Sequence, residues 1–153
     1  PEPRHGSAAQ ATGAGTAIMA GVLLAACGAR TESRSPVESP GADPTARTQA
    51  LDAGAELLQD RDPLDALNAY LDGFHFRAGD PGHQVEAHHF CANLNEELIQ
   101  CAIYDGNTRQ AKLVGIEYIV SARLFATLPE SEKVLWHSHV HEVKSGQLIA
   151  PGI

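Results

Sequence analysis

The sequence predicts an α+β domain: a helical hairpin followed by a small, mostly antiparallel sheet with short helices. Apolar residues fall at helical spacing from residue 45, and two strand-like runs, 87–92 and 98–104, flank a polar turn. Every Phe, Tyr and Trp lies between Tyr70 and Trp136, so the core belongs to the C-terminal part. The chain stops at Ile153 on apolar residues with no polar tail, so we expect the domain to be C-terminally incomplete.

Residues 1–26 have the pattern of a signal peptide. Their apolar run, 16–26, is too short for a bilayer span, which takes about 20 residues. The run ends in Leu-Ala-Ala-Cys27, which resembles the lipobox of bacterial lipoproteins and implies an exported, membrane-anchored lipoprotein acylated at Cys27. Gly28 after this cysteine favours the outer membrane in a Gram-negative cell. The alternative is an unstructured Ala/Gly leader in which the cysteine occurs by chance.

Residues 27–45 follow as the lipidated cysteine and a flexible linker. Between residues 28 and 44, Val37 is the one aliphatic side chain larger than Ala, so little apolar burial can offset the entropy of ordering this stretch. The predicted domains are therefore the signal peptide 1–26, the anchor and linker 27–45, and an incomplete α+β domain 46–153.

Two helices are predicted at the start of this domain. The first begins after Thr45, a potential N-cap, and carries apolar side chains at i, i+3, i+4, i+7 and i+8: Ala50, Ala53, Gly54, Leu57 and Leu58. The second is capped by Asp62, has Pro63 at its first position and ends at Gly73. We expect each helix to bury its apolar stripe.

The runs 87–92 and 98–104 predict a β-hairpin. If its loop centres on Glu96, Cys91 lies directly opposite Cys101, at a separation suited to a cross-strand disulfide. An exported domain can form such a bond. The alternative is two unbridged thiols packed as small hydrophobic groups.

Residues 112–121 are apolar on both faces, which predicts a central strand. Glu117 interrupts one face, and a carboxylate in a central strand must be paired or hydrogen-bonded. It is a candidate proton acceptor; the alternatives are a solvated edge position or a structural ion pair. Short helices are predicted at 122–125 and 129–135.

The segment 136–142 is the densest in groups that bind metals or transfer protons. As a strand it would place His137, His139 and His141 on one face; as a helix it would place His137 and His141 one turn apart. Either geometry lets two imidazoles meet one divalent ion such as zinc, with further ligands from His88, His89 or Glu117. The alternative is a hydrogen-bonded polar layer or exposed side chains.

Several classes of function are disfavoured. The formal net charge of −8 argues against a nucleic-acid partner, which requires clustered Lys and Arg. The sequence has no Gly-x-Ser-x-Gly elbow, no phosphate-binding glycine loop with Lys-Ser/Thr, and no Cys-x-x-Cys pair.

From about Asn68 onward, several motifs resemble the oil body-associated protein family, known from seed lipid droplets. They are Tyr70–Phe76, Glu86–Cys91, Gln100–Asp105, Gly115–Ile119, Leu128–Pro129, Leu135–His139 and Glu142–Gly146. The resemblance implies association with a lipid droplet or lipid surface and carries over no catalytic residue. His141 stands where the plant proteins typically carry an aromatic residue, which leaves His137, His139 and Glu142 as matched positions.

Two functional hypotheses follow, and the residues leave open whether the chain is an enzyme. In the first, a lipoprotein tethered through Cys27 binds or organises a lipid surface. In the second, a divalent-metal-dependent enzyme holds its ion with His137, His139 and either His88 or His89. Glu117 or Glu142 would then accept a proton from metal-bound water.

Overall fold

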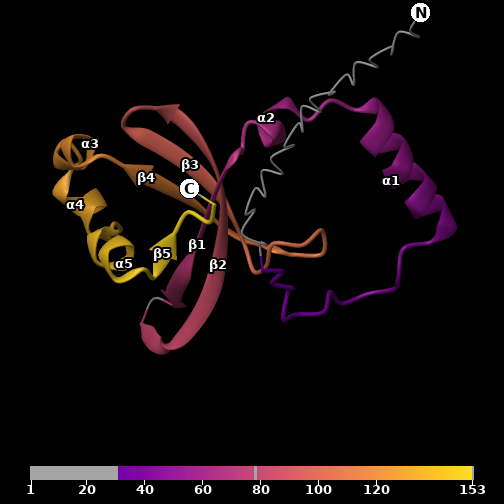
Figure 1. The fold of residues 1–153 in the computed structure, drawn as a ribbon, viewed down its shortest axis with the longest axis horizontal. Helices are drawn as coiled ribbons and strands as arrows, with labels where there is room; N and C mark the ends of the chain where they lie inside the picture. Colours follow the sequence, from indigo (N-terminus) through magenta and orange to yellow (C-terminus); the bar gives the residue numbers. More distant parts are fainter. Residues whose placement is uncertain (1–30, 78, 153) are drawn as a thin grey trace, which may run out of the picture.

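The computed structural model describes residues 31–77 and 79–152, so the predicted signal peptide and Cys27 lie outside the described residues. Within them, one five-stranded antiparallel sheet is accompanied by short helices (Figure 1), and the predicted α+β class is confirmed. The elements in chain order are α1 (Ala46–Leu58), α2 (Asp62–Asp65), β1 (Ala69–Arg77), β2 (Asp80–Asn95), β3 (Leu98–Tyr104), β4 (Leu113–Val120), α3 (Ala122–Ala126), α4 (Glu130–Lys133), α5 (Val140–Ser145) and β5 (Leu148–Ile149).

The strands are ordered β4-β3-β2-β1-β5, and β2 with β3 forms the hairpin that the sequence predicts. Cys91 is paired with Cys101 in this hairpin, and a disulfide with an S–S distance of 2.01 Å joins them. The buried core is small and lies around this bond; its apolar members are Tyr70, Ala87, Cys91, Ala92, Cys101 and Ile103.

Strand β4 lies at the edge of the sheet, so the prediction of a central strand is wrong. It pairs with β3 on one side, and both Leu113 and Val114 are 57% exposed. Apolar residues on both faces of a strand indicate that both faces can be buried. They do not determine whether the strand has a neighbour on one side or on both. The short helices predicted after this strand are confirmed as α3 and α4.

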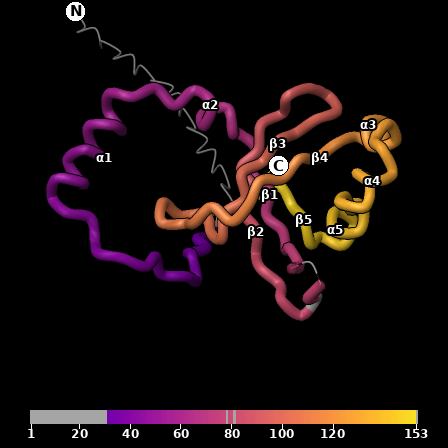
Figure 2. Tube along the Cα trace, turned by 180° about the vertical axis from the view of Figure 1, so that it is seen from behind, coloured from indigo at the N-terminus to yellow at the C-terminus, as the bar shows by residue number. Residues whose placement is uncertain are grey.

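Helix α1 forms where predicted, and the Thr45 side chain accepts a hydrogen bond from the Thr48 backbone N–H. The expected burial of its apolar stripe is wrong: no residue of α1 is buried, and Leu57 is 82% exposed. In both views α1 stands apart from the sheet (Figures 1 and 2). A salt bridge of 2.8 Å between Glu56 and Arg109 joins α1 to the loop before β4.

The second predicted helix is also corrected. It closes after the single turn of α2, and the chain is already a strand at Ala69, four residues before the predicted end at Gly73. Tyr70, Phe74 and Phe76 share one face of β1, and pairing with β2 across the whole strand overrides the leucine spacing that suggested a helix.

Part of the predicted linker lies against the sheet. The backbone N–H of Ser33 donates to Asn107 Oδ1 at 3.0 Å, and the Asn107 N–H donates to Ser33 O at 2.8 Å. Gly106 allows this approach, because a Cβ at that position would meet Ser33 O at 2.6 Å. These hydrogen bonds thus order residues that lack apolar side chains. Amino-acid composition alone does not predict such bonds.

Candidate functional site

Three strands bring histidine and glutamate to one face of the sheet. Residues paired across neighbouring strands point to the same face, and the register places His89, the Cys91–Cys101 pair and Glu117 together. His75 of β1 shares this face. Between the two histidines along β1 and β2 lies the pair Gly73–Ala87. The Leu148 side chain lies over Gly73, because a Cβ at that position would meet Leu148 Cδ1 at 2.8 Å.

The polar atoms of these three residues converge. His75 Nε2 lies 2.9 Å from His89 Nε2 and 3.3 Å from Glu117 Oε2. His89 Nε2 lies 3.6 Å from the same carboxylate oxygen. The His89 side chain is 1% exposed, that of Glu117 13% and that of His75 31%, so the site is buried at His89 and partly open to solvent at His75.

A second group adjoins the first from the segment between α4 and α5. His139 Nε2 lies 3.1 Å from His137 Nε2 and 3.6 Å from Glu117 Oε1, and His137 Nε2 lies 3.8 Å from Glu142 Oε1. The two carboxylate oxygens of Glu117 therefore face different histidines. We call the set His75, His89, Glu117, His137, His139 and Glu142 the histidine–glutamate cluster.

The segment that carries this second group is neither of the two predicted geometries. His137 and His139 lie in the irregular stretch before α5, and Glu142 lies in the first turn of that helix. His141 is exposed and makes no contact with the cluster that the structure records. An irregular backbone can aim two imidazoles at one point without the fixed spacing of a strand or helix.

Of the residues singled out in the sequence, the structure brings together His89, Glu117, His137, His139 and Glu142. It places His88 on the opposite face of β2, because successive strand residues alternate. The cluster also contains His75, which sequence reasoning missed because β1 was taken for a helix end. The signal that would have found it is the alternation Phe74-His75-Phe76, a β-like pattern with histidine on one face.

The surroundings shift the pKa of two members. Burial lowers the pKa of His75 below its usual value of 6.5, and although Glu117 raises it, the neighbouring histidines lower it further. Burial alone would raise the pKa of Glu117, but the hydrogen bond with His89 and electrostatic interactions with His89, His139 and His75 bring it below 4.5. The site therefore favours a carboxylate beside an unprotonated His75.

These shifts predict how stability depends on pH. Because the unfolded chain binds a proton to His75 more readily than the folded chain, the free energy of unfolding should begin to fall as the pH drops through 6.5. Glu117 adds to the loss below 4.5, since its folded pKa is depressed. Urea unfolding of the metal-free chain measures this free energy in a series of buffers from about pH 8 to about pH 4. This range brackets the reference pKa values of histidine and glutamate.

His75→Gln supplies the control for that experiment. It should remove the part of the pH dependence that begins at 6.5 and leave the part below 4.5. An unchanged curve in this variant would contradict the assignment to His75.

The cluster opens onto a groove between β4 and the helices α3, α4 and α5. This cavity has a volume of about 910 Å³, and it is lined by Glu117, His137 and His139 at one end and mainly by apolar side chains elsewhere, among them Ile116, Ile119, Phe125, Leu135, Trp136, Val140 and Val143. A second, much smaller cavity of about 10 Å³ lies among Phe74, His75, His89, His139, Glu142 and Leu148. The arrangement thus places polar, ionisable groups at one end of a mainly apolar groove.

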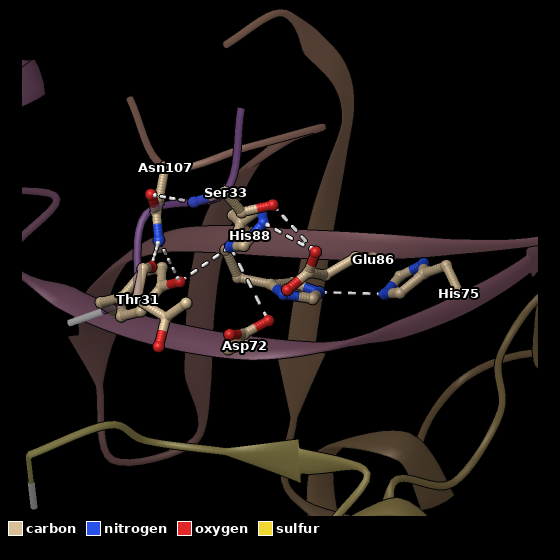
Figure 3. A network of polar contacts seen from close by, with 9 residues as sticks. Thr31, Ser33, Asp72, His75, Glu86, His88 and Asn107 are labelled. Carbon is tan, nitrogen blue, oxygen red and sulfur yellow. Dashed lines mark hydrogen bonds and ion pairs between the residues drawn. The ribbon is translucent and has the colours of Figure 1, made fainter. Parts of the chain in front are cut away.

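On the other face of the sheet, His88 belongs to a separate network (Figure 3). Its Nδ1 lies 2.7 Å from the Tyr70 hydroxyl and 3.7 Å from Asp72 Oδ1. Its Nε2 lies 3.8 Å from Glu86 Oε2 without a hydrogen bond. The side chain is completely buried, and the Glu86 carboxylate is held by the Ser33 hydroxyl, which donates to it at 2.9 Å. This network ties the segment before α1 to the sheet.

Fold and site together define a small α+β domain that carries ionisable side chains beside an apolar groove. The family model described as "Protein of unknown function (DUF1264)" matches residues 61–153, which include the whole cluster. The chain belongs to this family, whose curated relatives are the oil body-associated proteins, and the predicted resemblance is confirmed.

Among these relatives, oil body-associated protein 1B of Arabidopsis thaliana is 50% identical over 114 residues, covering 74% of this chain and 47% of that protein. Oil body-associated protein 1A of Zea mays is 50% identical over 117 residues, covering 76% of this chain and 49% of that protein. The chain thus spans about half the length of the curated relatives it matches. No solved structure matches it. Within residues 31–77 and 79–152, no helix has the length and apolar character needed to cross a membrane.

Proposed function

We propose that this domain binds at a lipid surface through the groove between β4 and the helices α3, α4 and α5. The observation that carries the proposal is the concentration of exposed apolar side chains along that groove and on its rim. Val134 is 80% exposed, Leu135 75%, Ile116 71% and Val143 59%. Large exposed apolar patches mark interaction sites for proteins or membranes.

The relatives favour a lipid over a protein partner. All the relatives named above are called oil body-associated, and an oil body presents a lipid surface. Apolar side chains on short helices gain free energy by entering the boundary between head groups and acyl chains, in proportion to the apolar area buried. The helices α3–α5 gather on one side of the molecule, where they can approach such a surface together (Figures 1 and 2).

Charge restricts the kind of lipid. With a formal net charge of −8, the chain is repelled by anionic head groups, which attract clusters of Lys and Arg. Binding should therefore rest on apolar insertion into a zwitterionic or neutral surface and depend little on salt.

An acylated Cys27 is the second attachment in this proposal. The lipobox pattern supports it, and so does the Cys91–Cys101 disulfide, since such bonds persist in oxidising compartments such as the bacterial periplasm. The acyl group would hold the domain near a membrane, and the groove would engage the surface itself. A Cys27→Ala chain removes the first attachment and leaves the second to be measured alone.

The experiment is flotation of the Cys27→Ala chain with phosphatidylcholine-coated triacylglycerol droplets. We expect the chain to float with the droplets, and Leu135→Asp to weaken its partition about tenfold or more, because burying one leucine side chain is worth about 2 kcal/mol. Leu57→Asp on α1 is the matched control, since Leu57 is 82% exposed and lies outside the groove. The proposal is overturned if the parent chain stays in the aqueous fraction, or if both aspartate variants weaken partition equally.

A further inference from the structure

We infer that His75, His89 and Glu117 form a binding site for one divalent transition-metal ion, Zn²⁺ or an ion of similar preference. The inference concerns the inner end of the histidine–glutamate cluster and is independent of lipid binding. Histidine nitrogen and carboxylate oxygen are established zinc ligands, and a set of two histidines and one glutamate occurs in catalytic zinc sites.

The distances between the three donor atoms fit one ion. Zinc bonds nitrogen at about 2.0–2.1 Å and carboxylate oxygen at about 2.0–2.2 Å, so two ligands of a tetrahedral ion lie about 3.3–3.4 Å apart. The observed separations are 2.9 Å, 3.3 Å and 3.6 Å. All three atoms can therefore bind the same centre after shifts of a few tenths of an ångström.

A cavity of matching size lies beside His75 and His89, and Glu117 is not among its lining residues. Its volume is about 10 Å³, and His75, His89, His139 and Glu142 are among its lining residues. That volume holds about one water-sized sphere, so it admits a single ion and no organic molecule. His139 Nε2, 3.6 Å from the other oxygen of Glu117, is an additional nitrogen donor beside this site.

Hydrogen bonding alone leaves this site incompletely satisfied. If His75 and His89 are neutral, each has one N–H, and their 2.9 Å contact uses one N–H and one lone pair. Glu117 Oε1 and Glu142 Oε2 remain buried without a hydrogen-bond partner. Buried acceptors without a donor cost free energy, and a cation at this point would interact favourably with both carboxylates and with the imidazole lone pairs.

Metal analysis of the full chain tests the inference. After removal of metals with chelator and dialysis against Zn²⁺, we expect about one equivalent of bound zinc by elemental analysis, and a Co²⁺-loaded chain with the visible absorption of a tetrahedral site. His75→Ala and the nearly isosteric Glu117→Gln should each weaken Zn²⁺ affinity at least tenfold, since both remove a direct ligand.

Two exposed histidines provide matched controls: His83 in the same strand as His89, and His141 close to His139. His83→Ala and His141→Ala should keep the zinc content and the cobalt spectrum. Circular dichroism of each variant without metal separates loss of a ligand from loss of the fold, and Glu117→Gln serves where His75→Ala fails to fold. The inference is overturned if the parent chain binds no zinc, or if folded Glu117→Gln binds it as tightly as the parent. Zinc lost equally in the control variants would also overturn it.

Discussion

Replacing both Cys91 and Cys101 with alanine is expected to lower the free energy of unfolding by about 3 kcal/mol. The bond closes a loop of sequence separation 10, and the chain-entropy relation for a loop of this size gives a value near 3 kcal/mol. Both side chains are fully buried at the centre of a small core, so their truncation adds a packing loss. Since small domains have only about 5–15 kcal/mol of stability, this is a large fraction.

Urea unfolding monitored by circular dichroism measures the change, and reduction of the parent chain with a thiol separates the two contributions. The reduced parent loses the cross-link and keeps both sulfur atoms in the core, so it should be more stable than the double alanine variant. A double variant as stable as the oxidised parent would show that the bond contributes nothing to the folded domain.

The sequence predicts the parts of this fold that depend on short-range patterns. Strands β3 and β4, the hairpin that pairs Cys91 with Cys101, and the Thr45 cap all follow from alternation, turn residues and capping chemistry within a few positions. The prediction from sequence fails where pairing with a distant strand determines the secondary structure. Leu71 continues the helical spacing of Leu64 and Leu67, yet residues 69–73 belong to β1 and pair with β2. A long partner strand offers them more hydrogen bonds than one further helical turn would.

The same limit applies to the site. The sequence shows which residues carry imidazoles and carboxylates, and it shows that His88 and His89 are neighbours. Neighbours in a strand, however, lie on opposite faces of the sheet. Which of them meets Glu117 depends on the register of β2, β3 and β4, and that register is a property of the whole sheet. His75 enters the cluster by the same route, through pairing with a strand that begins several residues later.

His88→Ala is expected to destabilise the domain by about 3 kcal/mol while leaving the histidine–glutamate cluster intact. The imidazole is fully buried, stacks on the Tyr70 ring with centroids 6.1 Å apart, and holds a hydrogen bond of 2.7 Å with the Tyr70 hydroxyl. Its removal leaves a cavity of ring size, for which truncation costs of about 3–5 kcal/mol are typical. The Tyr70 hydroxyl keeps a partner in Asn107, so the loss is mainly one of packing.

The matched control is His83→Ala in the same strand, where an exposed side chain should change the free energy of unfolding by less than about 0.5 kcal/mol. Equal stability of the two variants would contradict a packing role for His88. Zinc content of folded His88→Ala then tests the sequence-based prediction that His88 is a metal ligand. Because His88 lies on the far side of the sheet from Glu117, we expect that content to be unchanged. The two adjacent histidines would then have different roles on opposite faces of the sheet: His88 would stabilise the fold, and His89 would bind the metal ion.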